Sequence, residues 1–278
     1  MRPGLEPIPL VSTCPRCGAP GGQGRFCASC GQVLGSHGTQ VIAVPAGPGR
    51  ASATPFGALG PGRTRLVLES GLGAPPGAVF PLDAETVPVG RGEGPVRFAD
   101  DPCLAPRHAM LHFRDGGLHV RDEGAPGGVF LRLRGLSVPL RPGDHFAVGE
   151  RLLRYAGPLP PAPTPPPDGT LRLGAPRPAA PAVVVEEWLE GGTGGRVFVR
   201  GGASITIGRA GCAISLGDDP HVSQAHAELL LDGRGGVRLR DLGSSNGTYL
   251  KLPAHSEREL HDGDWIRVGH EVLRVATG

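Results

Sequence analysis

Apolar residues in the C-terminal third of the chain fall in short runs separated by turn residues. The runs include 182–189 (AVVVEEWL), 204–208 (SITIG) and 237–242 (VRLRDL), and in the last two apolar and polar residues alternate. A period of two, interrupted by turns every few positions, is typical of an antiparallel β-sandwich of about ten short strands. We therefore predict an all-β fold. Further runs of the same kind are 196–200, 225–231, 248–250, 264–269 and 272–276.

The same pattern occurs twice in the chain. The segment VGRGEGPVRFADDPCLAPRHAMLHF (89–113) aligns with IGRAGCAISLGDDPHVSQAHAELLL (207–231) at an offset of 118 residues. The offset grows to 119 where Asp122 meets Asp241, and to 120 further on, so two one-residue insertions account for the drift. An internal repeat of this length indicates two copies of one domain. We expect them at 63–156 and 181–278.

Two linkers separate the expected domains. Residues 35–62 are rich in Gly, Pro, Ala and Ser, which predicts a flexible linker. Residues 157–180 are dense in proline and predict a stiffer spacer, because proline favours the extended polyproline II conformation. A ligand for a proline-binding domain is the alternative interpretation of this second segment.

Four cysteines near the start of the chain have the spacing C-x2-C-x9-C-x2-C, within residues 12–34. Each C-x2-C turn aims two thiolates at one ion, and two such turns complete a tetrahedral structural zinc site. Two disulfides or a redox pair are the alternatives. The stretch resembles the short zinc ribbons at the N-termini of many bacterial regulatory proteins, and its four expected zinc ligands are Cys14, Cys17, Cys27 and Cys30.

Charge and composition exclude several classes of protein. The net charge is +2, from 28 basic and 26 acidic residues, which is too balanced for a nucleic-acid footprint or a polybasic membrane patch. We find no transmembrane-length apolar run and no secretory signal, and we expect a cytoplasmic protein. Lys251 is the only lysine and Asn246 the only asparagine, a bias that suggests a GC-rich, bacterial genome.

Unusual polar residues of the second copy fall between the expected strands. Loops at one end of a sandwich converge in space, so these residues are candidates for one binding site. An arginine fork and serine hydroxyls suit a phosphate group, and an asparagine amide suits a peptide main chain. The residues concerned are Arg209, Ser223, His226, Ser244, Ser245 and Asn246.

The pattern GR…SxxHA…SSNGT in a small β-sandwich resembles the forkhead-associated (FHA) domain, a phosphothreonine-binding module. The resemblance implies that Arg209, Ser223 and Ser245 contact the phosphate, with Ser244 beside them. It implies further that Asn246 binds the ligand main chain, and that His221 and Gln224 bias the side-chain preference after the phosphothreonine. The residues expected to brace the loops rather than contact ligand are Gly208, His226, Gly247 and Thr248.

The first copy departs from this pattern. It keeps Arg91 and His108, but Ala105 stands at the position of Ser223 and 125–127 (APG) at the position of 244–246. The phosphate thereby loses its hydroxyl partners and the peptide loses its amide contact. We expect a degenerate FHA-like domain that acts as a spacer or a docking surface.

These features predict a non-catalytic adaptor in Ser/Thr kinase signalling, whose partner is a phosphothreonine-containing protein such as a kinase or its substrate. The alternative is a zinc-ribbon regulator of transcription or of a nucleic-acid complex, with the FHA copies as docking modules. No nucleophile elbow surrounds Ser223 and no phosphate-binding glycine loop is present, which argues against an enzyme. A phosphorylated Thr39 or Thr164 in a linker is a possible ligand within the chain itself. Cys103 and Cys212 have no assigned role.

Overall fold

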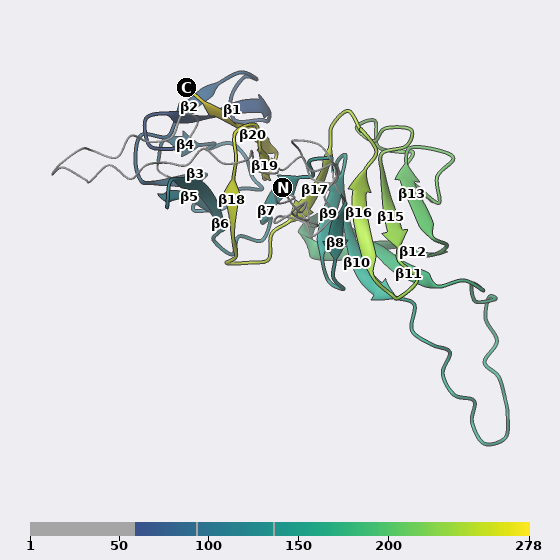
Figure 1. Ribbon diagram of the computed structural model, residues 1–278. Helices are drawn as coiled ribbons and strands as arrows, with labels where there is room; N and C mark the ends of the chain where they lie inside the picture. Colours follow the sequence, from purple (N-terminus) through teal and green to yellow (C-terminus); the bar gives the residue numbers. More distant parts are fainter. Residues whose placement is uncertain (1–58, 93, 136) are drawn as a thin grey trace, which may run out of the picture. The chain divides into compact units, whose positions relative to one another are not determined.

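The computed structural model describes residues 59–92, 94–135 and 137–278 (Figure 1). They belong to one compact unit, Thr54–Gly278. The described residues contain twenty β-strands and a single turn of 3-10 helix, η1 (Glu190–Gly192), so the all-β prediction is confirmed. The predicted zinc ribbon, residues 12–34, lies outside the described residues.

Each sequence repeat contributes ten strands. Those of the first repeat are β1 (Thr64–Ser70), β2 (Val79–Pro81), β3 (Thr86–Gly90), β4 (Val96–Arg97), β5 (Ala109–Arg114), β6 (Gly117–Asp122), β7 (Val129–Arg132), β8 (Val138–Leu140), β9 (His145–Val148) and β10 (Arg151–Pro158). Those of the second repeat are β11 (Ala182–Leu189), β12 (Thr193–Gly201), β13 (Ser204–Gly208), β14 (Ile214–Ser215), β15 (Ala227–Leu231), β16 (Val237–Asp241), β17 (Thr248–Lys251), β18 (Glu257–Leu260), β19 (Trp265–Val268) and β20 (Glu271–Thr277).

The alternating sequence pattern becomes alternating burial. In β16, Val237 and Leu239 are buried, whereas Arg238 and Arg240 are exposed. Successive side chains of a strand point to opposite faces of its sheet, so a period of two directs every second residue into the core.

The strands form three sheets. One has ten strands in the order β12-β11-β10-β9-β17-β7-β19-β20-β1-β2. The two others have five strands each, in the orders β14-β13-β15-β16-β8 and β18-β6-β5-β3-β4. The ten-stranded sheet is symmetric about its centre, where β7 pairs with the equivalent strand of the second repeat, β17. Outward from this pair, each strand on one side has its repeat equivalent at the same place on the other side.

The two largest hydrophobic cores of the described residues each combine both repeats. The first core joins residues of β1–β7 to Leu260, Ile266 and Leu273 from the end of the second repeat. The second core joins residues of β11–β16 to Phe146 and Leu153 from the end of the first repeat. The segments β8–β10 and β18–β20 are therefore exchanged between the two sandwiches, and we call them the exchanged segments.

The exchange differs from the two consecutive sandwiches expected at 63–156 and 181–278. Strand β1 pairs with β20, with Leu66 opposite Val275, and β10 pairs with β11, with Tyr155 opposite Val185. The physical reason lies in the repeat itself: the exchanged segments present equivalent apolar faces, so either one fits either framework. The sequence pattern specifies which faces are apolar but not which copy they cover.

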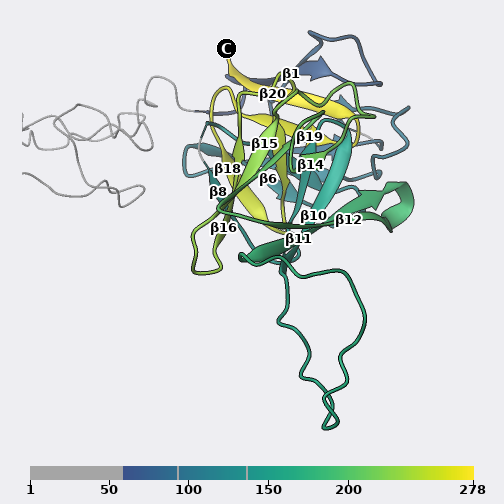
Figure 2. The ribbon, with the colours of Figure 1, turned by 90° about the vertical axis from the view of Figure 1, so that its right-hand side faces the viewer.

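The proline-rich spacer connects two strands that pair with each other, β10 and β11. Residues 160–181 are all exposed, and no strand or helix interrupts the segment between Pro158 and Ala182. Figure 2 shows it as a long loop that extends away from the ends of these strands.

Candidate functional site

Three loops of the second repeat meet at one edge of the sheet formed by β13, β15 and β16. Strand β13 ends where β15 begins, with Ile207 opposite Ala227, and β16 ends beside the same point, with Asp241 opposite Ala227. The loops that carry Arg209, Ser223 and residues 244–246 therefore leave the sheet together. The structure brings the predicted site residues into one region.

His226 lies at the centre of these loops and is 0% exposed. Its Nδ1 accepts a hydrogen bond from the Ser223 N–H (3.1 Å), and its Nε2 lies 3.1 Å from the Gly247 carbonyl oxygen. Because Nδ1 accepts, the ring proton sits on Nε2 and is donated to Gly247. Burial lowers the pKa of His226, which keeps the ring in this neutral form. The ring thus joins two of the three loops.

Asp241 is a second brace of these loops, and it was not among the residues predicted for the site. Its carboxylate accepts hydrogen bonds from Gly243 N (2.9 Å), Ser244 N (3.0 Å), Ser244 Oγ (2.6 Å) and Thr248 Oγ1 (2.6 Å). Burial by itself would raise the pKa of Asp241, but these hydrogen bonds, chiefly those from Ser244 and Thr248, together outweigh it and lower the pKa. The only signal for Asp241 in the sequence was its alignment with Asp122.

Ser244 occupies a bracing position although it was predicted as a ligand contact. The residue is 7% exposed, and its hydroxyl donates to Asp241 and accepts from the Gly247 N–H (3.0 Å). Its hydrogen-bonding capacity is directed inward. Thr248, predicted as a brace, is buried and bonds the same Asp241 carboxylate.

The two predicted glycines sit where a side chain does not fit. A Cβ on Gly208 would collide with the Gln224 carbonyl oxygen and the Cys212 sulfur. Gly247 has a φ of 81°, and a Cβ there would collide with the Arg132 side chain. Both positions need glycine, one for close approach and one also for its left-handed backbone.

The remaining predicted residues face outward. Exposed side chains are those of Arg209, His221, Gln224, Ser245 and Asn246, and Ser223 is partly buried.

Hydrogen bonds to backbone groups hold these outward-facing residues in place. Ser223 Oγ accepts from the Ser245 N–H (3.2 Å), and Asn246 Nδ2 donates to the His221 carbonyl (2.8 Å). The Arg209 N–H donates to the Ser223 carbonyl (2.9 Å), and Gln224 Nε2 donates to the Ala210 carbonyl (3.2 Å). A serine hydroxyl that accepts one bond still has its proton to donate, and an amide with one N–H engaged keeps a second N–H and an oxygen.

The exchanged first-repeat segment supports the loop that carries Ser223. The buried carboxylate of Asp219 accepts from His221 N (2.8 Å) and from Glu150 N (2.8 Å), which belongs to the turn between β9 and β10. His221 Nε2 also lies 3.4 Å from Glu150 Oε1. Glu150 is 69 residues away in sequence from Asp219, and no pattern in the sequence predicts the contact, because only the exchange brings the two residues together.

The first repeat contains counterparts of two of these braces, His226 and Asp241. His108 is 0% exposed, accepts from Ala105 N (3.1 Å) and lies 2.9 Å from the Gly128 carbonyl oxygen. Asp122 accepts from Gly124 N (2.7 Å) and Val129 N (2.8 Å). The scaffold is therefore shared by the two repeats, whereas the outward-facing serines and asparagine occur only in the second.

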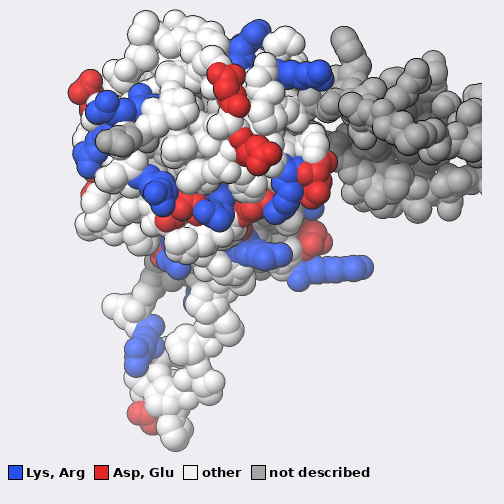
Figure 3. Space-filling model, turned by 90° about the vertical axis from the view of Figure 1, so that its left-hand side faces the viewer, with Lys and Arg blue, Asp and Glu red and all other residues white. Residues whose placement is uncertain are grey.

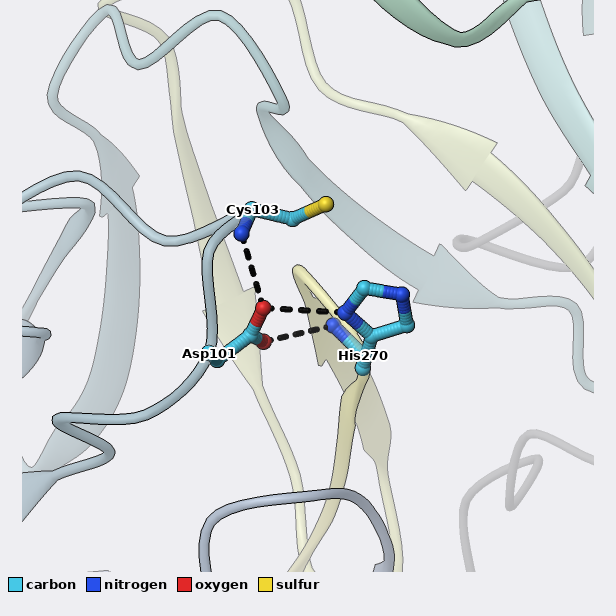
Figure 4. Close-up of side chains that lie close together, drawn as sticks. All are labelled: Asp101, Cys103 and His270. Carbon is cyan, nitrogen blue, oxygen red and sulfur yellow. Dashed lines mark hydrogen bonds and ion pairs between the residues drawn. The ribbon is translucent and has the colours of Figure 1, made fainter.

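Figure 4 shows the first-repeat counterpart of the Asp219 contact. Asp101 is buried and accepts from Cys103 N (2.8 Å) and from N and Nδ1 of His270 (2.8 and 2.9 Å), with His270 supplied by the exchanged turn between β19 and β20. Burial, together with the charges of Asp101 and Glu190, raises the pKa of the Cys103 thiol. The thiol therefore stays protonated and is not an activated nucleophile.

Comparison with known proteins finds a known domain family in the second repeat. Residues 205–269 match the family model of the FHA domain, so the chain contains an FHA domain at these residues. Over 87 residues the chain is 39% identical to the FHA domain-containing protein FhaA of Mycobacterium tuberculosis (strain ATCC 25618 / H37Rv), a match that covers 31% of this chain and 16% of FhaA.

Solved structures of FHA proteins are also similar in sequence. Mycobacterium tuberculosis EmbR in complex with a low affinity phosphopeptide is 31% identical, with 30% of this chain and 22% of EmbR covered and a TM-score of 0.19. A structure from an analysis of phosphothreonine-dependent FHA domain interactions is 36% identical, with 33% of this chain and 93% of that chain covered and a TM-score of 0.20. The present chain spans less than a quarter of FhaA and of EmbR.

No helix within the part of the chain that the structure describes is long and apolar enough to cross a membrane.

Proposed function

We propose that the second repeat binds a phosphothreonine peptide at the edge formed by its three loops. Arg209, Ser223 and Ser245 contact the phosphate, and Asn246 binds the peptide main chain. His221 and Gln224 lie beside them and influence the choice of the following residue. The observation that carries the proposal is the contrast between the repeats: the buried histidine and the bracing aspartate occur in both, whereas Ser223, Ser245 and Asn246 have no counterpart in the first.

The chemistry of the exposed side chains fits this ligand. A phosphate carries more than one negative charge near neutral pH and accepts several hydrogen bonds. The Arg209 guanidinium supplies a permanent charge and paired donors, and hydroxyls and loop N–H groups add further donors. The match of residues 205–269 to the FHA family, and the phosphothreonine-dependent binding named for a relative, support the same conclusion.

At the level of the whole protein, we propose a non-catalytic, cytoplasmic adaptor in bacterial Ser/Thr kinase signalling. The first repeat then serves as a scaffold that completes the second sandwich and as a docking surface. Cys14, Cys17, Cys27 and Cys30, outside the described residues, are proposed to hold a structural zinc ion. The face seen in Figure 3 carries acidic and basic side chains next to one another, and this mixture does not favour the alternative of nucleic-acid binding.

The test is calorimetry on the full chain with a phosphothreonine peptide library and the same peptides without phosphate. The full chain is needed because the second core contains residues of β9 and β10. We expect phosphate-dependent binding that Arg209→Ala weakens at least tenfold, since a hydrogen bond to a charged group contributes about 1.5–3 kcal/mol.

The chain supplies its own control for this experiment. Arg91 aligns with Arg209 at the repeat offset but stands beside a loop without the serines. Arg91→Ala should leave phosphopeptide affinity unchanged. Equal binding by the Arg209→Ala variant and the wild-type protein would show that the phosphate does not bind at this loop edge.

A further inference from the structure

Two histidines and a glutamate meet on one face of the sheet β18-β6-β5-β3-β4. His112 in β5 lies directly opposite His119 in β6. His119 in turn faces Glu259 of β18, and Glu257, two residues away on the same strand, shares that face. One nitrogen from each ring and one oxygen of Glu257 lie within 4.8 Å of one another.

The donor atoms of this cluster are only partly satisfied. His112 Nε2 lies 3.1 Å from Glu257 Oε2, and the rings of His112 and His119 are stacked with their centroids 5.5 Å apart. His119 Nδ1 is buried and has no hydrogen-bond partner in the described part of the chain. A buried imidazole nitrogen without a partner is unfavourable, and a bound cation satisfies such a lone pair.

Glu257 is oriented by a neighbour on β5. Arg114 Nη2 lies 2.7 Å from Glu257 Oε1, which leaves Oε2 directed at His112. This ion pair orients the carboxylate, in the same way that hydrogen bonds from residues outside the coordination shell orient the ligands of a metal ion. His112 and Glu257 are 19% and 27% exposed, so the cluster is shielded but open to ions from solvent.

We propose that His112, His119 and Glu257 form a binding site for a divalent ion of the zinc class. Two imidazoles and a carboxylate are ligands that Zn²⁺, Co²⁺, Ni²⁺ and Cu²⁺ accept, whereas Mg²⁺ and Ca²⁺ prefer oxygen alone. Bonds of about 2.1 Å in a tetrahedron require ligand atoms about 3.4 Å apart, which small side-chain rotations provide from the observed spacing. Solvent completes the coordination.

The fold does not require this cluster. In the second repeat, the strand pair equivalent to His112–His119 is Leu230–Arg238, and Arg238 Nε donates to Ser137 Oγ (2.8 Å) at the position of Glu257. An apolar residue, a cation and a hydroxyl offer no metal site on an otherwise equivalent framework. The three ligand residues are thus a property of the first sandwich alone.

The other cluster of potential ligands among the described residues does not qualify. Asp101, Cys103 and His270 also approach one another, but both oxygens of Asp101 already accept hydrogen bonds from the other two residues (Figure 4). The same contact, made by Asp219 in the second repeat, uses only backbone N–H donors. This cluster is a structural brace of the repeats.

The proposed ion would have a structural consequence. Glu257 belongs to an exchanged segment, whereas both histidines belong to the first repeat. A shared ion therefore links β18 to β5 and β6, and it stabilises the exchanged arrangement by binding the folded protein alone.

The experiment uses the full chain with Cys14→Ser, Cys17→Ser, Cys27→Ser and Cys30→Ser, which remove the four thiolates that would compete for the ion. After treatment with a chelator, calorimetric titration with Zn²⁺ should show one ion bound per chain, and the ion should raise the Tm. With Co²⁺, the ligand-field bands should appear without the thiolate charge-transfer band of a cysteine site.

Variants of the ligands decide the outcome. His119→Gln and Glu257→Gln should each weaken Zn²⁺ binding at least tenfold and abolish the rise in Tm, whereas the exposed His255→Gln should change neither. Circular dichroism of the metal-free variants verifies folding, and if His119→Gln does not fold, Glu257→Gln provides the measurement. Absence of a bound ion, or equal Zn²⁺ affinity in the wild-type background and the ligand variants, would overturn the proposal.

Discussion

The matched buried histidines of the two repeats allow the bracing role to be separated from general stability. His226→Ala removes a ring that is 0% exposed and leaves the Ser223 N–H and the Gly247 carbonyl without their partners. Each unsatisfied backbone group costs about 1–3 kcal/mol, and the cavity adds to this. We expect a loss of about 3–5 kcal/mol in the free energy of unfolding.

The same substitution should also impair binding. Without the ring, Ser223 and the loop before β17 lose their common support, so the hydroxyls that meet the phosphate are no longer held in place. We expect phosphopeptide affinity to fall at least tenfold, which corresponds to about 1.4 kcal/mol. Urea denaturation measures the stability, and calorimetry at a temperature where the variant is folded measures the affinity.

His108→Ala is the control, because His108 is equally buried and makes the equivalent bonds to Ala105 and Gly128. It should lower stability by a similar amount and leave phosphopeptide affinity unchanged. If His108→Ala weakens binding as much as His226→Ala, the loss of affinity comes from general instability and not from the loss of local bracing by His226.

Three further predictions concern the exchange, pH and the asparagine. A disulfide, detected by peptide mapping, should form in an Arg65→Cys, Ala276→Cys double variant, because these residues pair across β1 and β20. In two consecutive sandwiches the partner of Arg65 would instead be Ala156. Disulfide formation in an Arg65→Cys, Ala156→Cys variant, and not in the first variant, would therefore contradict the exchange. Burial lowers the pKa of both bracing histidines, His108 and His226, below their usual 6.5, so unfolding below this pH takes up protons. Their contribution to stability is complete above about pH 6.5 and is lost as the pH falls through the lowered pKa. Denaturation curves that do not change between pH 7.5 and about 5.5 would contradict this pH dependence. Asn246→Gly should leave the Tm within a few degrees of the wild-type value, because Gly occupies the aligned turn of the first repeat, and should abolish measurable phosphopeptide binding; retained affinity in calorimetry would remove Asn246 from the site.

Much of the site could be predicted because its residues are close in sequence and the repeat provides an internal comparison. Arg209, Ser223, Ser245 and Asn246 belong to loops that one sheet edge must bring together. Ser244 was predicted to contact the ligand but occupies a bracing position. The sequence shows that this residue has a hydroxyl, but not that the hydroxyl is directed inward to the Asp241 carboxylate. The direction of a side chain depends on the backbone conformation of its turn, and the amino-acid sequence alone does not specify that conformation.

The sequence by itself determined the all-β class and the residue types that line the loop edge, because strand periodicity, turn glycines and side-chain chemistry are local properties. Only the tertiary structure decided which copy each exchanged segment completes, since both segments have equivalent apolar faces. It also decided the contacts that follow from that choice, such as Glu150 with Asp219 and Glu257 with His112, which join residues 69 and 145 positions apart. Residues this far apart in sequence come into contact through the packing of the whole fold, so a local sequence pattern does not predict which residues they contact.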